Sequence, residues 1–210
     1  GSGVADIKLG RHGDQLASAL HGKYAEHALN GNLFYISTVV AGLAIPISTT
    51  TAPTMVLWNP TGSGVDAVLV RYTAAHASGD GVLFGVGINS AGTADVGSAI
   101  STAAVFSAFA QAAVGTNLFN ARLNKGNTSK IKSAATATNT LTAAGTWIKA
   151  LGINAGALVA TTAVDSRVFV YDFDGEMVIS PGVAVYITAN AASVALFHQT
   201  WSWYEVPTTV

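Results

Sequence analysis

The chain has no cysteine, few charged residues and no long apolar run, and each absence excludes a class of protein. The lack of cysteine excludes disulfides and thiolate metal sites. Only 10% of the 210 residues are Asp, Glu, Lys or Arg, against about 25% in an ordinary soluble domain. Ser, Thr, Asn, Gly and Pro interrupt every apolar stretch before it reaches the roughly 18 residues of a membrane-spanning helix. We therefore expect no disulfide-stapled domain and no membrane partner.

The few charges are balanced, which argues against a nucleic-acid partner. Ten basic residues stand against eleven acidic ones, and the net charge is -1. The densest basic cluster, Lys125, Lys130 and Lys132, is too small to follow a phosphate backbone. We expect no binding to DNA or RNA.

Four long stretches carry no charged residue at all: residues 28–65, 96–121, 133–148 and 177–204. Surface charge keeps folded domains apart in solution, so a chain of this composition is expected to associate. The centres of subunit interfaces are depleted of charge in the same way. Many of the apolar residues are alanines, which tolerate exposure, and this is the alternative explanation. We favour a large interface between copies of the chain in a symmetric homo-oligomer.

The first thirty residues differ from the rest, because they hold six of the twenty-one charges and three of the five histidines. The apolar residues Leu16, Leu20, Tyr24 and Ala28 recur at a spacing of four. This spacing predicts an amphipathic helix or arm that ends at Asn30–Gly31. We assign residues 1–31 to an N-terminal arm and residues 32–210 to one domain. Residues 1–3 are interpreted as a cloning remnant, and the start has no apolar segment of the secretory kind.

From Asn32 onward, short apolar runs alternate with turn signals. They predict strands over residues 33–40, 54–59, 65–77, 82–88, 166–173, 183–190 and 193–206. Strict alternation in the third run places Val68, Val70, Tyr72 and Ala74 on one face. Residues 98–117 fit a helix or a strand equally well. Turns every 8–12 residues or so are typical of an all-β fold, an antiparallel β-sandwich of the jelly-roll type.

One stretch, DFDGEMVISPG (residues 172–182), concentrates three acids in five residues. Asp172, Asp174 and Gly175 match the start of a calcium loop, but the next positions are apolar and cannot act as ligands. On an extended strand Asp172, Asp174 and Glu176 would share one face, so a surface cation site is an alternative. We favour a bend, because Asp-Gly and Ser-Pro-Gly are turn sequences. We expect neither a metal nor a cofactor.

No group of residues predicts catalysis. HASGDG (residues 76–81) holds a His, a Ser and an Asp, but three residues of one turn cannot easily form a nucleophilic triad. The glycines of residues 81–92 lack phosphate-loop spacing, and the five histidines lack metal-ligand spacing. Glycoside hydrolysis needs two carboxylates across a cleft, and the one acidic cluster lies on a bend. We assign no catalytic residue and expect a protein that is not an enzyme.

The aromatic residues near the C-terminus are the best candidates for binding. On a strand, Trp201 and Trp203 share a face with Phe197, while Tyr204 lies on the opposite face. Trp201, Trp203 and Tyr204 could form a platform for a host surface glycan. A strand with one aromatic side and one polar side is more often packed against a core or an interface, and we favour that interpretation.

Several stretches, taken in order, resemble a family of largely uncharacterised virion proteins of tailed bacteriophages. They are HGKYAEHALNGNLF, STVVAGLAIPISTTTAPTMVLWNPTGSG, ISPGVAVYI and the closing SWYEVP. The similarity runs from about His21 to Pro207, and its strongest parts are residues 48–64 and 203–207. It implies a β-sandwich or jelly-roll particle component, often trimeric, on the capsid, neck or tail, with no catalytic residue to transfer. It therefore predicts a virion location, a homotrimeric head-associated or capsid decoration protein, and other capsid proteins as partners.

Overall fold

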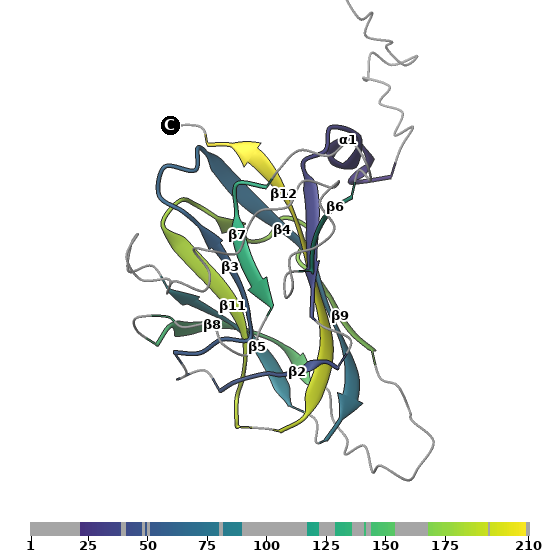
Figure 1. Ribbon diagram of the computed structural model, residues 1–210, viewed down its shortest axis with the longest axis vertical. Coiled ribbons are helices and arrows are strands. Elements are labelled where there is room, and N and C mark those ends of the chain that lie inside the picture. Colours follow the sequence, from purple (N-terminus) through teal and green to yellow (C-terminus); the bar gives the residue numbers. More distant parts are fainter. Residues whose placement is uncertain are drawn as a thin grey trace, which may run out of the picture.

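Two antiparallel β-sheets face each other in the computed structural model, and the short helix α1 (Ala25–Leu29) lies at one end (Figure 1). The structure describes residues 22–38, 41–47, 49, 51–79, 82–89, 117–121, 129–135, 141, 144–153, 168–192 and 194–208. The all-β sandwich predicted from the strand pattern is confirmed.

We call the larger sheet the front sheet and the other the back sheet. The front sheet has the order β10-β4-β12-β1-β6, with β9 also paired to β4 and β2 to β12. Its strands are β1 (Leu33–Ser37), β2 (Leu43–Ala44), β4 (Val65–Ser78), β6 (Asn117–Asn120), β9 (Val168–Asp172), β10 (Val178–Ile179) and β12 (Leu196–Pro207). The back sheet, in the order β7-β3-β11-β5-β8, contains β3 (Met55–Asn59), β5 (Leu83–Asn89), β7 (Lys132–Ala135), β8 (Thr146–Ile153) and β11 (Val183–Ala189).

The path of the chain between the sheets is that of a jelly roll. Leaving aside the short strands β2, β6 and β7, and counting β9 and β10 as one interrupted strand beside β4, the chain crosses from one sheet to the other between successive described strands except from β5 to β8. The first strand, β1, pairs with the last, β12, in the middle of the front sheet. This nesting of early strands against late ones gives the two Greek keys of a jelly roll.

The core lies between the two sheets and is rich in aromatic residues. Alternation along β12 places Phe197, Trp201 and Trp203 inside, each 0% exposed. Tyr72 of β4 and Phe84 of β5 pack against them from both sheets. Burial of such rings stabilises the fold by about 1.5–3 kcal/mol each before opposing terms are counted.

A β-bulge changes which residues of β4 face the core. Ser202 pairs with Arg71, but the next residue of β12, Trp203, pairs with Leu69, so Val70 is an extra residue on β4. The alternation changes phase there: Leu69 and Tyr72 are both in the core, whereas Val70 is outside the core cluster. The predicted face of Val68, Val70, Tyr72 and Ala74 is therefore wrong, because strict alternation does not allow for a bulge.

The helix ends where the sequence predicts. The amide of Gly31 donates to the carbonyl of Ala28, and the amide of Asn32 donates to that of His27. Gly31 has a φ of 73°, in the left-handed region that glycine adopts most easily. The earlier part of the predicted helix, with Leu16 and Leu20, lies outside the described residues, as does the ambiguous segment 98–116.

Candidate functional site

The acidic stretch forms a bend within one edge strand of the front sheet. β9 and β10 both pair with β4 in the same antiparallel sense: Asp172 pairs with Arg71, and Val178 with Val68. The chain thus takes six residues to go from Asp172 to Val178, while the paired strand β4 takes three to go from Arg71 to Val68. The extra length is taken up at Asp174 and Gly175, with φ of 50° and 87°. The predicted bend is confirmed, although the chain continues in its original direction.

Ser180–Gly182 then carries the chain from the front sheet to the back sheet. The amide of Val183 donates to the carbonyl of Ser180 at 3.3 Å, and Gly182 has a φ of 90°. Proline followed by a glycine of positive φ is the sequence expected for a type II turn.

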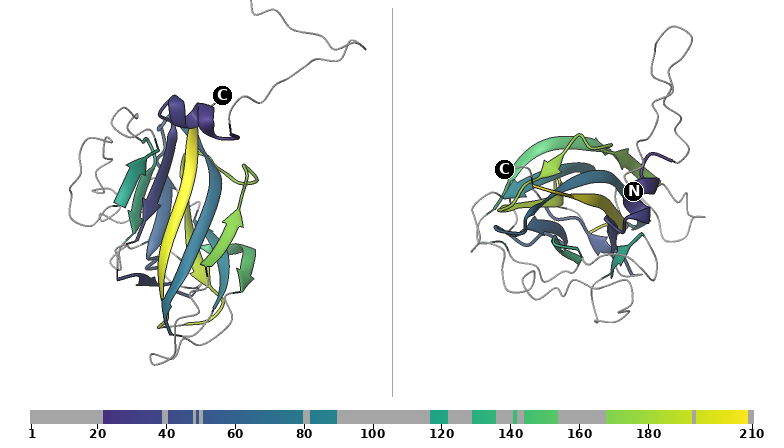
Figure 2. Two further views of the ribbon diagram at one scale, coloured as in Figure 1. Left: turned by 90° about the vertical axis from the view of Figure 1, so that its right-hand side faces the viewer. Right: turned by 90° about the horizontal axis from the view of Figure 1, so that it is seen from above.

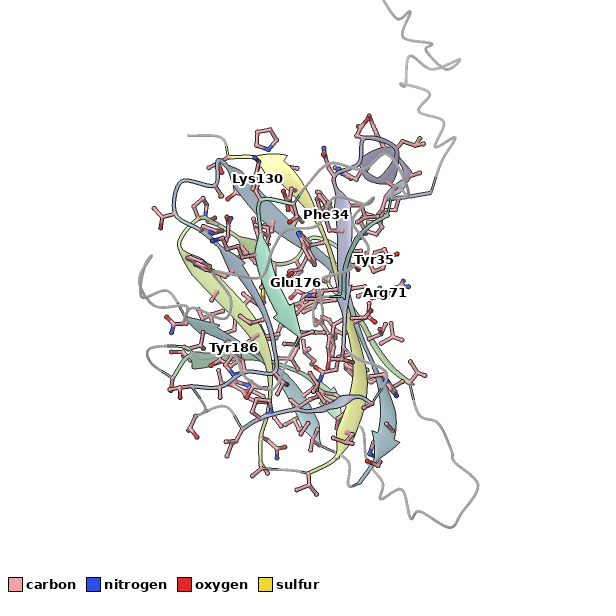
Figure 3. The ribbon with its side chains drawn as sticks, in the orientation of Figure 1. Phe34, Tyr35, Arg71, Lys130, Glu176 and Tyr186 are labelled. Atoms are coloured by element: carbon pink, nitrogen blue, oxygen red, sulfur yellow. The ribbon has the colours of Figure 1, made fainter. Side chains whose placement is uncertain are left out.

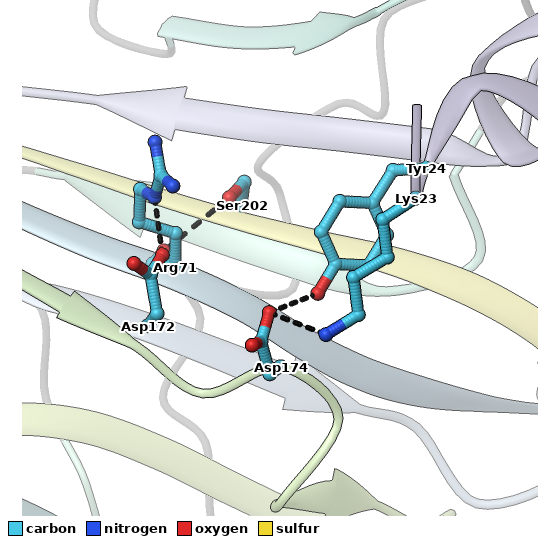
Figure 4. Close-up of polar contacts among 6 residues, drawn as sticks. All are labelled: Lys23, Tyr24, Arg71, Asp172, Asp174 and Ser202. Atoms are coloured by element: carbon cyan, nitrogen blue, oxygen red, sulfur yellow. Dashed lines mark hydrogen bonds and ion pairs between the residues drawn. The ribbon is translucent and has the colours of Figure 1, made fainter. Parts of the chain in front are cut away.

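Each of the three acids has its own basic partner, and Figure 4 shows the pairs of Asp172 and Asp174. The Arg71 Nε lies 2.5 Å from the Asp172 Oδ1, and the Lys23 Nζ lies 2.7 Å from the Asp174 Oδ1. Glu176 forms an ion pair with Lys149 of β8.

Neutral donors add to two of these pairs. The Tyr24 hydroxyl donates to Asp174 at 2.6 Å, and the Tyr171 hydroxyl donates to Glu176 at 3.1 Å. Hydrogen bonds from Lys23 and then Tyr24 lower the pKa of Asp174 below its usual value. Hydrogen bonds from Lys149 and then Tyr171 do the same for the pKa of Glu176.

This arrangement removes the geometric basis for a surface cation site at Asp172, Asp174 and Glu176. The three carboxylates are paired separately, and no group of three His, Asp or Glu side chains within the described part of the chain is placed to hold a metal ion. The acids instead link the turn that precedes α1, β4 and β8 to the edge strand.

The C-terminal aromatics divide between the core and the surface. Trp201 and Trp203 are 0% exposed, and their rings contact those of Phe173 and Phe34 at centroid distances of 6.2 and 5.9 Å. The preferred interpretation as core residues is confirmed for both. They cannot serve as an exposed platform for a sugar, because sugar stacking needs an open ring face.

Tyr204 is on the other side of β12 and supports the helix. The His27 ring stacks on it at 3.9 Å between centroids, and Tyr24 lies at 6.1 Å. The Tyr204 side chain is half-buried, so its contact is with the chain's own helix. The strand alternation predicted its side of the sheet but not this partner.

Sequence reasoning missed Glu205, the one buried acid of the closing motif. It is 7% exposed, yet its carboxylate accepts a hydrogen bond from the Ser129 hydroxyl. The amide of Lys130 donates to both of its oxygens, at 3.1 Å to Oε1 and 3.0 Å to Oε2. The amide of Ile131 and the Trp203 indole donate at 3.4 Å each. These donors offset the loss of hydration of the buried charge. Glu205 thereby ties β12 to the segment that leads into β7.

A pocket of about 400 Å³ lies beside this carboxylate. It is lined by Asn32, Phe34, Val65, Lys130, Glu205, Val206 and Pro207. The Glu205 oxygens that border it are already occupied by hydrogen bonds from the chain. The carboxylate in this pocket is therefore already satisfied by the chain and is not available to a ligand.

A second tie involves Asn59, the last residue of β3. Asn59 is 0% exposed, and its amide donates at 2.8 Å to the carbonyls of Val65 and Ile179. The Ser63 hydroxyl donates to its Oδ1 at 2.5 Å. Asn59 and Glu205 are thus both buried polar residues that hold the sandwich together.

The outer face of the back sheet is covered by the chain itself. Val56, Trp58, Ala184 and Tyr186 form a second buried cluster there, which Leu141 completes. We call this surface the covered face. On β5 next to it, a Cβ at Gly85 would lie 2.2 Å from the Trp147 ring and one at Gly87 2.5 Å from the Tyr186 ring. The glycines leave room for large rings to lie across the sheet.

No described helix or strand covers the outer face of the front sheet below α1, as Figure 2 (left) shows, and Tyr35 and Arg71 point outward from this sheet in Figure 3. Its residues lie in three rows across the paired strands. We call them the bare face: Val168, Ala75 and His198; Val170, Thr73, Thr200 and Ser37; Asp172, Arg71, Ser202 and Tyr35. Val168 and Val170 are 60% and 48% exposed. The only charges in these rows are Arg71 and Asp172, which neutralise each other.

Comparison of the chain with known proteins finds no matching family model, no matching curated protein and no matching solved structure. Among the described residues, no helix has the length and apolar character needed to cross a membrane. The geometry places the described side chains that the sequence singles out in the core, in internal ties or on the surface.

Proposed function

We propose that this chain is a structural protein of a tailed-bacteriophage virion, without enzymatic activity, that works as a homotrimer on the head as a capsid decoration or head-associated protein. The observation that carries the proposal is an open, charge-neutral sheet face on a jelly roll. Jelly rolls recur in viral capsid proteins. The resemblance of residues 21–207 to phage virion proteins supports the same conclusion.

Such a protein would stabilise a particle by joining copies of itself and neighbouring capsid subunits. The net charge of -1 gives little repulsion between copies. The strands are held internally by buried ties such as Glu205 and Asn59, so the outer surfaces can bear load without distorting the core. Closed symmetry would then limit growth to a defined oligomer.

Two measurements test this proposal. Light scattering on the purified protein at micromolar concentration should give a mass of about 64 kDa, three times the 21.3 kDa of the chain. Cryo-electron microscopy of the virions should show the jelly roll on the outside of the head. A monomer in solution would contradict the homotrimer, and particles without density for this chain would contradict the virion location.

A further inference from the structure

We propose that the bare face is the contact between copies, and that three copies turn this face toward a common axis. The inference rests on the proposed function and adds to it the surface and the partner, which is a second copy of the same chain.

The first argument is the chemistry of the exposed residues. Val168 and Val170 protrude side by side from β9, with more than two fifths of each side chain in water. The neighbouring strands contribute Ala75, Thr73 and Thr200, which are short and only partly exposed. Short side chains lose little rotamer freedom when they are buried, so the entropic cost of covering this surface is small.

The second argument is charge. Around a symmetry axis, each residue near the axis meets its own copies, so a net charge on the face would repel itself. Here the Arg71 guanidinium lies against Asp172 of the adjacent strand at 2.5 Å, and the other rows carry no Asp, Glu, Lys or Arg. A surface without net charge can meet a second copy of itself without repulsion. A face that binds a partner of opposite charge would instead carry an unpaired charge of its own, and these rows carry none.

The third argument is the contrast with the covered face. On the back sheet, the chain places Trp58, Tyr186 and Leu141 over the strands and buries them. On the front sheet, helix α1 is confined to one end, over Tyr204, and leaves the three rows open (Figure 2, left). Both sheets thus have one face in the core, and among the described residues it is the front sheet whose other face has no buried cluster over it.

Charge placed on the bare face tests this proposal. Val170→Lys and Thr200→Lys should each raise the dissociation constant of the oligomer by roughly ten-fold or more, because the introduced ammonium groups would meet around the axis. The matched control is Val194→Lys, since Val194 is 88% exposed and lies in the loop before β12, away from these rows. It should leave the oligomer unchanged. Circular dichroism melting of each variant reports whether it is folded.

Cross-linking gives a second readout that does not depend on weakening the oligomer. Because the chain has no cysteine, a single introduced thiol is the only reactive one. Thr200→Cys should form covalent dimers with a short bismaleimide, since the residue meets its own copy, and Val194→Cys should not.

The outcomes separate the face from the wider proposal. An oligomeric wild type whose mass survives both lysine variants, and whose Thr200→Cys variant does not cross-link, overturns the bare face as the contact and leaves self-association standing. A monomeric wild type overturns both. If the wild type is a monomer and the lysine variants are absent from purified virions, the bare face binds a different capsid protein.

Discussion

The two outer faces of this sandwich are made of similar antiparallel strands, yet one is buried and the other is open. The covered face uses large rings, Trp58 and Tyr186, with glycines beneath or beside them. The bare face uses mostly the short residues Val, Thr, Ser and Ala, together with Tyr35, His198 and the Arg71–Asp172 ion pair. A sheet that its own chain covers needs side chains that fill space, whereas a sheet that meets a separate molecule gains from short side chains that are already ordered.

The comparison also separates stability from association. Residues of the covered face are buried in the isolated chain, so their substitution should change the free energy of unfolding. Residues of the bare face are partly or largely exposed, so their substitution should change the contact between molecules and leave the fold nearly intact. The predictions that follow test this division, beginning with the largest effect.

Trp58→Ala should destabilise the chain by about 3–5 kcal/mol, because it removes a buried ring from the covered face and leaves a cavity. Trp58 is 6% exposed, and the Lys132 Nζ lies 5.3 Å from its ring. Urea unfolding followed by fluorescence or circular dichroism measures the change. A loss below about 1 kcal/mol would show that the covered face contributes little to the fold.

A matched pair of valines gives the sharpest form of the comparison. Val56 on the covered face is 0% exposed, and Val170 on the bare face is 48% exposed. Val56→Ala should lower the free energy of unfolding by about 2 kcal/mol, and Val170→Ala by less than about 0.5 kcal/mol. Unfolding should be measured below the concentration at which copies associate, so that self-association does not add to the measured free energy of unfolding. Equal losses would remove the distinction between the two faces.

Most of the fold could be predicted from local patterns. The seven predicted strands all exist, because alternation and turn sequences are local signals, and Gly182 and Gly31 adopt the positive φ that their positions suggest. β8 was missed, since two register shifts against β5 interrupt its alternation. β6 and β7 were missed as well, and each has only four residues, too few to establish a period.

The site could be predicted only in part, because its partners come from distant residues. The acids at 172–176 were visible in the sequence, but their partners Lys23, Arg71 and Lys149 lie on three other segments. The partners of Glu205 could not be predicted for the same reason, since Ser129 and Lys130 come about 75 residues earlier. Long-range polar contacts follow from the topology, and the topology of a sandwich is not determined by a list of strands.

Glu205→Gln tests the point where the two sheets are joined, at the end of the molecule. The amide oxygen can still accept from Lys130 and Ser129, but these bonds lose the strength given by the charge. We expect a loss of roughly 1–2 kcal/mol in the free energy of unfolding, with the jelly roll retained. Ser63→Ala, at the Asn59 tie, serves as a comparison between the two internal ties. An unchanged stability in Glu205→Gln would mean that the carboxylate charge is not needed there.

The smallest effect should come from α1, which is held on the front sheet by exposed contacts and not by a buried cluster. Pairing with Lys23 and Tyr24 lowers the pKa of Asp174 in the folded chain. A carboxylate of this kind stabilises the fold above its unfolded pKa, and the contribution is lost as pH falls through the folded pKa, so the loss should begin below about pH 4.

Asp174→Asn should remove this component of the acid dependence of the melting temperature. Glu26→Gln, which removes an acid of α1 outside the ion pairs, should retain it, because Asp174 keeps both partners. Identical acid profiles for wild type and Asp174→Asn would show that the helix is held by the stacking of His27 on Tyr204 alone.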